Sequence, residues 1–157
     1  MREILFRGKR LDNGEWVEGA SFNTRNEAFY ICPTVSDITY GDNGKRRRIG
    51  CWYAVDLFTV GQYTGLKDKN GKRIFEGDII GTRYDSLYPD HVTVEVVKWF
   101  RNGWAIQEGD CMPDSLTEDG ILPYSEIIGN IHDNPELLKG GNEDYLQSGK
   151  TGGREND

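Results

Sequence analysis

The segment VGQYTGLKDKNGKRIFEGDII, from Val60 to Ile80, combines the signals of two strands, the turn between them and a sharp glycine corner. We predict a two-residue turn at Asn70-Gly71, because Asn and Gly both accept the positive φ angles that a tight hairpin requires. The apolar side chains on either side of this turn are expected to enter a core, and Gly77 to form the corner that starts the next strand. The segment therefore predicts the centre of a small β-rich domain.

Three further Asn-Gly pairs repeat this signal, at Asn13-Gly14, Asn43-Gly44 and Asn102-Gly103. Each pair lies between segments with apolar or aromatic residues, which is the pattern of a β-hairpin. The 20 glycines also fit a chain that turns often. We predict a mainly β fold of antiparallel hairpins, arranged as a sheet or barrel, with an SH3-like barrel portion around Phe75–Ile80 and one short C-terminal helix.

The first and third hairpins share an aromatic-x-Gly before the turn, Phe6-Arg7-Gly8 in one and Tyr63-Thr64-Gly65 in the other. This repetition indicates either one hairpin device used twice or two related subdomains. Residues 1–138 are expected to form one domain, or two subdomains of about residues 1–58 and 59–138. Residues 139–157 are polar and Gly-rich, and we expect them to form a flexible tail.

The other elements are predicted from alternation and from capping residues. The stretch His91–Val96 places three valines on one face, and the change of phase at Val96-Val97 predicts a bulge. The C-terminal helix is expected to have Asn134 as its cap and Pro135 at its first position, with the two leucines that follow docked on the sheet. Further strands are predicted at Glu15–Ala20, Ala28–Cys32, Arg48–Val55, Asp78–Tyr84, Trp104–Glu108 and Glu126–Ile131.

Composition excludes several classes of protein. The 19 Lys and Arg residues are outnumbered by 26 Asp and Glu residues, and the net charge of −7 disfavours general binding to duplex DNA. The sequence has no apolar run long enough for a membrane helix, so no membrane association is expected. The three cysteines, Cys32, Cys51 and Cys111, are widely spaced, which favours reduced thiols in a bacterial cytoplasm over a zinc site.

Candidate catalytic residues are few. The two histidines, His91 and His132, are interpreted as surface or turn residues, because a general base would need a partner side chain beside it. Glu76 and Asp78 could do acid–base work or bind a cation, but we expect Asp78 to accept hydrogen bonds from the backbone of its own turn. The common enzyme motifs are absent. We therefore expect no catalytic residues, no cofactor and no metal.

The sequence resembles the YopX family of phage and prophage proteins. The resemblance is carried by four blocks and covers Arg2 to Leu138, and only Ser21 to Ile49 and the tail depart from it. It implies a mainly β, self-associating protein of phage or prophage origin and transfers no catalytic residue. The blocks are Phe6–Lys9 with Trp16–Gly19, Thr59–Asp68, Asn70–Lys72 with Phe75–Ile79, and Ile127–Leu138.

Three hypotheses for function follow. The first is a non-enzymatic accessory protein that acts by binding and self-association, with the edge strands at Ala28–Cys32 or Val92–Val97 available for pairing. The second is a binder of single-stranded DNA or RNA, since a basic run beside aromatic residues supplies both phosphate and stacking contacts. The third is an anti-defence protein that captures a host protein or a small nucleotide. The residues proposed for nucleic-acid or partner binding are Lys45, Arg46, Arg47, Arg48, Trp52 and Tyr53.

Overall fold

The computed structural model describes residues 3–23, 28–33, 38–40, 46–48, 51–83, 92–118 and 122–139, with the backbone alone at residues 22, 23, 38–40 and 46–48. The chain is mainly β and divides into two compact units, Met1–Leu66 and Lys67–Asp157. Every pairing between its strands is antiparallel within the described residues. The predicted fold class is therefore confirmed, whereas the predicted tail lies outside the described residues after Lys139.

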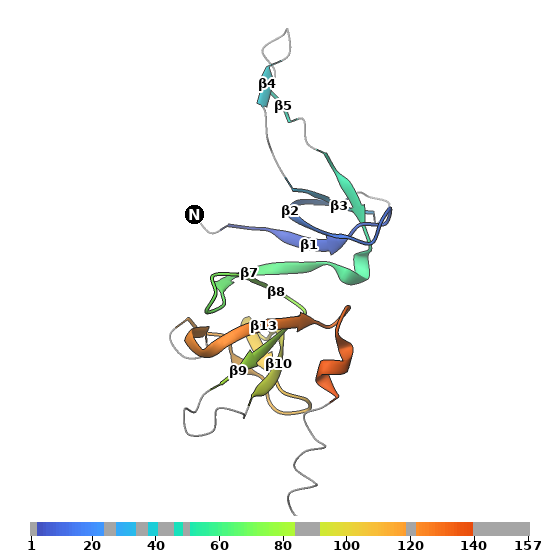
Figure 1. Ribbon diagram of the computed structural model, residues 1–157. Coiled ribbons are helices and arrows are strands. Elements are labelled where there is room, and N and C mark those ends of the chain that lie inside the picture. Colours follow the sequence, from blue (N-terminus) through green and yellow to red (C-terminus); the bar gives the residue numbers. More distant parts are fainter. Residues whose placement is uncertain are drawn as a thin grey trace, which may run out of the picture. The chain divides into compact units, whose positions relative to one another are not determined.

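The first unit is built on one sheet in which the strands run in the order β6-β3-β2-β1-β7 (Figure 1). A single bridge between Arg10 and Val55 also connects the end of β1 to β6, so this sheet curls back on itself. Two short strands, β4 and β5, pair with each other as a separate two-stranded sheet. The elements are β1 (Phe6–Lys9), β2 (Trp16–Asn23), β3 (Phe29–Cys32), β4 (Ile38–Tyr40), β5 (Arg46–Arg48), β6 (Tyr53–Val55), the 3-10 helix η1 (Leu57–Thr59) and β7 (Gly61–Lys67).

One hydrophobic cluster of the first unit contains the buried residues Val17, Ile31 and Val55, against which four half-buried hydrophobic residues pack. Cys32 and Tyr63 of this unit are buried as well. Each fully buried valine or isoleucine side chain contributes roughly 1.5–3 kcal/mol relative to its exposed state. Two glycines let the strands approach: a Cβ at Gly8 would lie 3.0 Å from Val55, and one at Gly19 only 1.9 Å from the carbonyl oxygen of Cys32. The half-buried residues are Phe6, Phe29, Tyr53 and Val60.

The second unit contains one open sheet in the order β12-β11-β10-β9-β13. Strands β9 to β12 form a meander, and β13 returns to pair with β9, beside which it lies in Figure 1. The sheet does not close into a barrel within the described residues, so the SH3-like portion stays a prediction. The elements are β8 (Arg73–Phe75), β9 (Asp78–Thr82), β10 (Thr93–Phe100), β11 (Gly103–Gln107), β12 (Asp114–Ser115), the 3-10 helix η2 (Leu122–Tyr124), β13 (Ser125–Asn130) and the 3-10 helix η3 (Pro135–Leu138).

Strand β9 is the centre of this unit, because all five of its residues are buried. Ile79, Ile80 and Val97 are fully buried, and Phe75 and Ile106 are each 1% exposed. The predicted role of Asp78 is confirmed: its Oδ2 accepts a hydrogen bond of 2.7 Å from the backbone N–H of Phe75. Gly77 has φ +82°, a left-handed conformation that makes the predicted corner.

The turn before β8 has three residues, so the predicted two-residue turn is wrong. Asp68 and Lys72 close it through a backbone hydrogen bond of 2.9 Å, and Gly71 at φ +78° completes it. A type I turn followed by a left-handed residue is the usual three-residue hairpin loop. Asp68 Oδ1 holds the loop by accepting hydrogen bonds of 2.9 Å from the N–H groups of Asn70 and Lys72.

The turn predicted at Asn102-Gly103 is one residue too late, because the observed two-residue turn is Arg101-Asn102. Gly103 pairs with Phe100, and the positive φ, +55°, falls on Arg101. In this register the buried residues Val97 and Ile106 lie directly opposite each other. A turn at Asn102-Gly103 would instead place Val97 opposite Glu108, so core pairing overrides the preference of the dipeptide.

Other predicted details also change. The register of β10 is continuous with both neighbours, so the predicted bulge at Val96-Val97 is wrong, and the sheet has its bulge in β13 between Ile127 and Gly129. The predicted strand Arg48–Val55 is interrupted, because β5 ends at Arg48 and Cys51 and Trp52 precede β6. The C-terminal helix is present as η3, but the side chain of Asn134 makes no capping hydrogen bond.

Candidate functional site

The predicted binding residues fall into two groups. Lys45 lies outside the described residues, and Arg46, Arg47 and Arg48 form β5, whose backbone pairs with β4 and whose side chains are not described. Trp52 is 43% exposed, whereas Tyr53 is half-buried in β6. The structure therefore describes the aromatic end of the predicted site and its backbone hairpin.

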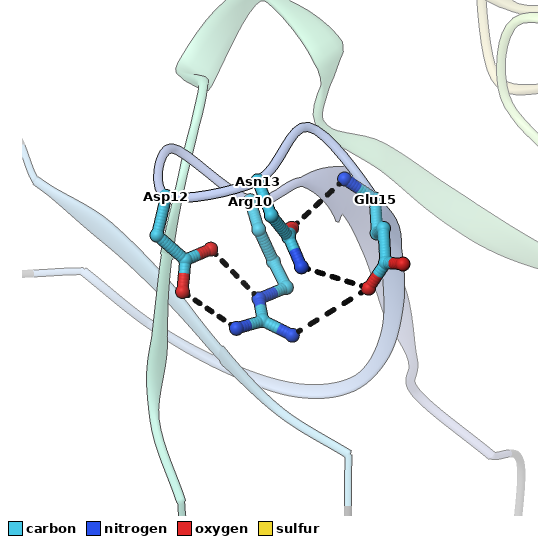
Figure 2. Close-up of polar contacts among 4 residues, drawn as sticks. All are labelled: Arg10, Asp12, Asn13 and Glu15. Carbon is cyan, nitrogen blue, oxygen red and sulfur yellow. Dashed lines mark hydrogen bonds and ion pairs between the residues drawn. The ribbon is translucent and has the colours of Figure 1, made fainter.

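The loop from β1 to β2 places an arginine on Tyr53. The Arg10 guanidinium carbon lies 3.9 Å from the centroid of the Tyr53 ring. The same guanidinium donates from Nε and Nη2 to the two oxygens of Asp12, at 2.9 and 2.6 Å, and its Nη1 lies 3.9 Å from Glu15 Oε2. Figure 2 shows both carboxylates around the arginine. The side-chain hydrogen bonding between Arg10 and Asp12 raises the pKa of Arg10 and lowers the pKa of Asp12.

Asn13 completes the loop. Its Oδ1 accepts a hydrogen bond of 3.0 Å from the backbone N–H of Glu15, and its Nδ2 donates to Glu15 Oε2 at 2.8 Å. The first Asn-Gly pair thus forms a hairpin as predicted, with Gly14 at φ +73°. Because Arg10 already covers one face of Tyr53, this ring orders the loop and is a poor stacking platform for a base.

A second feature of the first unit is an exposed apolar turn, the Leu57–Phe58 turn on η1. Phe58 is 89% exposed and Leu57 is 51% exposed. The turn is nevertheless held firmly, because Asp56 Oδ1 accepts a hydrogen bond of 3.0 Å from the N–H of Phe58. The buried Thr59 donates from its hydroxyl to the carbonyl of Asp56 at 2.7 Å and accepts from the N–H of Lys9 at 2.8 Å.

The second unit buries an acidic side chain. Glu95 is 9% exposed, and its Oε2 accepts a hydrogen bond of 3.2 Å from the hydroxyl of Thr82. The Thr82 hydroxyl also lies 2.9 Å from that of Ser125, so the network joins β10, β9 and β13. Burial raises the pKa of Glu95, and the charges of Glu108 and Asp114 raise it further. These residues make a polar network inside the sheet.

A groove runs along the other face of β10. Its volume is about 730 Å³, and Val94 and Val96 form its apolar floor with Leu137 and Leu138 of η3. Leu137 is half-buried and Leu138 is 39% exposed, so η3 docks only partly. Two valines of the predicted alternation, Val94 and Val96, therefore face this groove, whereas Glu95 and Val97 are buried on the opposite face of β10.

The candidate metal ligands and thiols lie apart in the part of the chain that the structure describes. There, no three His, Cys, Asp or Glu side chains converge on a metal position. Cys32 is buried, Cys51 and Cys111 are exposed, and no disulfide joins them. His132 lies beside Gly77, and His91 is outside the described residues. The described part of the chain also contains no helix that is long and apolar enough to cross a membrane.

Sequence reasoning missed the Leu57–Phe58 turn and the buried Glu95. The turn has a local signal, since Asp56 precedes it as a cap and Thr59 ends it. Glu95 has none, because a glutamate between valines is normally assigned to the solvent face of a strand. Its burial depends on Thr82 and Ser125, which are far away in the sequence.

The chain was compared with known proteins. The family model described as YopX protein matches residues 5–139. Among solved structures, the chain is similar to protein EF1440 from Enterococcus faecalis, with 27% sequence identity and a TM-score of 0.61. That similarity covers 88% of this chain and 99% of the other. No curated protein matches the chain.

Proposed function

Because the chain belongs to the YopX protein family, we propose that it is a non-enzymatic phage or prophage accessory protein that acts in the bacterial cytoplasm by binding and self-association. The observation that carries this proposal is the Leu57–Phe58 turn, on which a phenylalanine is 89% exposed. An aromatic side chain in water forgoes the free energy of burying its large apolar surface. A partner surface would recover that free energy.

The turn is suited to binding because its backbone is already ordered. Asp56 and Thr59 fix η1 through three hydrogen bonds, so little conformational entropy remains to be lost at this position on association. Leu57 adds a second exposed side chain next to Phe58. Aromatic anchors surrounded by smaller contacts are typical of the centre of a protein interface.

The partner we propose is a second copy of the chain. Two copies related by a twofold axis would each present the same turn, so one apolar feature would be buried twice in an isologous contact. Leu11 is 68% exposed on the β1–β2 loop of the same unit and supplies further apolar area. The contact requires no catalytic group.

Sedimentation velocity over a range of protein concentrations tests the proposal. We expect wild-type chain to shift towards a dimer as concentration rises, and Phe58→Ser to require at least tenfold higher concentration for the same shift. Met112→Ser is the matched control, because Met112 is 75% exposed in the other unit. A wild-type chain that stays monomeric at every concentration would refute self-association, and equal effects of the two substitutions would refute the role of the turn.

A further inference from the structure

The loop before β8 concentrates positive charge in an acidic chain. Residues 67–73 contain four cations and one carboxylate, whereas the chain as a whole has a net charge of −7. All four cations are exposed, and the carboxylate of Asp68 is buried. We name residues 67–73 the basic turn. Its cations are Lys67, Lys69, Lys72 and Arg73.

The basic turn presents these cations on an ordered backbone. Asp68 Oδ1 accepts hydrogen bonds of 2.9 Å from the N–H groups of both Asn70 and Lys72. The N–H of Gly71 donates to the carbonyl of Asp68, also at 2.9 Å. Because the buried carboxylate orders the loop from inside, little conformational entropy of the backbone remains to be lost when the turn binds a partner.

The hairpin geometry brings two of the cations side by side. The N–H of Asp68 donates to the carbonyl of Lys72 at 2.9 Å, which pairs these two residues at the end of the β7–β8 ladder. Lys67 and Arg73 are the next residues outward, so they lie opposite each other across the hairpin. Two like charges in these positions repel each other, and an anion that contacts both relieves the repulsion.

Glu126 of β13 connects the basic turn to a further cation. Lys69 Nζ lies 3.1 Å from Glu126 Oε2, and Arg83 Nη1 lies 3.9 Å from Glu126 Oε1. The side-chain hydrogen bond from Lys69 and its charge lower the pKa of Glu126, so this carboxylate is ionised between the two cations. Arg83 is exposed and extends the positive surface from the basic turn to the end of β9. Glu126 offsets only part of the positive charge here.

We propose that the basic turn, together with Arg83, binds the phosphodiester backbone of nucleic acid. Residues 67–73 include no apolar side chain, whereas the centre of a protein interface is apolar. Interfaces with nucleic acid are more polar and more positively charged, which is the character of this surface. The contacts are to phosphates, so binding is independent of base sequence. The net charge of −7 keeps it weak, and salt of about 0.1 M screens carboxylates that lie more than about 10 Å away.

The test is fluorescence anisotropy of a labelled oligothymidine and of a labelled duplex, each titrated with the full chain at a series of salt concentrations. If about four phosphates are contacted, log affinity for the single strand should fall against log salt with a slope of about −3. Lys67→Ala and Lys72→Ala should each weaken binding about fivefold at 0.1 M salt and reduce the steepness by about one. Lys139→Ala is the matched control, because Lys139 is an exposed lysine of the same unit at the end of η3.

Glu126→Gln tests the arrangement of charges more sharply. It removes the carboxylate that lies between Lys69 and Arg83, and both cations then become available to phosphates. We expect binding to become about fivefold tighter and its salt dependence steeper by about one. The ion pairs of Glu126 are partly exposed, so their loss should cost little stability, and circular dichroism checks that each variant is folded.

Three outcomes would overturn the proposal. One is the absence of salt-sensitive binding of either oligonucleotide by the wild-type chain at micromolar concentration. Another is an equal loss of binding in Lys139→Ala and Lys72→Ala, which would show that total charge matters and position does not. The last is unchanged binding in Lys67→Ala and Lys72→Ala with a loss in Arg47→Ala, which would place the nucleic acid at the basic hairpin of the first unit.

Discussion

The carboxylate of Asp68 accepts a hydrogen bond of 3.1 Å through Oδ2 from the backbone N–H of Ile127, a residue 59 positions later. Its other oxygen holds the Asn70 and Lys72 N–H groups, so one buried side chain joins the turn before β8 to the edge strand β13. The backbone N–H of Lys69 adds a hydrogen bond of 3.1 Å to the carbonyl of Ser125. The turn thereby covers part of the free edge of the sheet.

Replacing Asp68 by Ala should therefore lower the free energy of unfolding by about 2–4 kcal/mol, because three backbone donors lose a charged acceptor. Urea denaturation followed by circular dichroism measures this change. Asp110→Ala is the matched control, since Asp110 lies on an exposed loop and should change stability by less than about 0.5 kcal/mol. Similar losses in the two variants would show that Asp68 does not organise the edge.

Glu95 predicts a dependence of stability on pH. Burial raises its pKa in the folded chain above the unfolded value, so the folded state holds the proton more tightly. The contribution of this group is present below the unfolded pKa and is lost as pH rises through the folded pKa. Glu95→Gln keeps an oxygen that can accept the Thr82 hydrogen bond and carries no charge at any pH.

We therefore expect Glu95→Gln to be more stable than the wild type at neutral pH and to lose that advantage in acid. The measurement is urea denaturation of both chains at a series of pH values, with the difference plotted against pH. Other carboxylates contribute equally to both chains and cancel in that difference. A difference that stays constant across the series would contradict the assigned burial of the charge.

Gly19 predicts a large steric effect. A Cβ there would lie 1.9 Å from the carbonyl oxygen of Cys32, so Gly19→Ala must push β2 and β3 apart. We expect a loss of about 3 kcal/mol or more in the free energy of unfolding, measured by urea denaturation. Gly103→Ala is the control, because no atom lies within 4 Å of its Cβ position and its φ is not positive.

The positive φ at Arg101 leads us to expect that replacing this residue by glycine stabilises the chain, although a charge is lost. At φ +55° an arginine is strained and a glycine is not, so Arg101→Gly should raise the free energy of unfolding by about 1 kcal/mol. Asn102→Gly, which lacks this relief, should be neutral or slightly destabilising. Thermal denaturation distinguishes the two variants, and a lower melting temperature for Arg101→Gly would contradict the strain.

Local signals in the sequence predicted the hairpins and the corner at Gly77. Gly14 and Gly71 have the positive φ that their dipeptides indicated, and Asp78 accepts the hydrogen bond expected of it. These features could be predicted because the residues involved are close together in the chain. The exact register could not be predicted in this way. In the β10–β11 hairpin, the pairing of the buried residues Val97 and Ile106 determines that Arg101 takes the positive φ.

The candidate site was harder to predict for a physical reason. The basic run at Arg46–Arg48 is conspicuous in the sequence, but whether an aromatic ring is available depends on the neighbours that the fold brings to it. Arg10 reaches Tyr53 across 43 positions, and no pattern around either residue indicates that contact. Trp99, by contrast, is 51% exposed because it lies near the end of strand β10, whose inner residues Glu95 and Val97 are buried.

The return of β13 to β9 also determines when the second unit can form during synthesis. The hydroxyls of Thr82 and Ser125 are in contact although 43 positions separate them. A ribosome must therefore complete β13 before the most buried strand has both of its neighbours, and pairings this distant form slowly. Until then the nascent chain exposes one edge of an apolar strand, and unpaired edges of this kind favour premature association between growing chains.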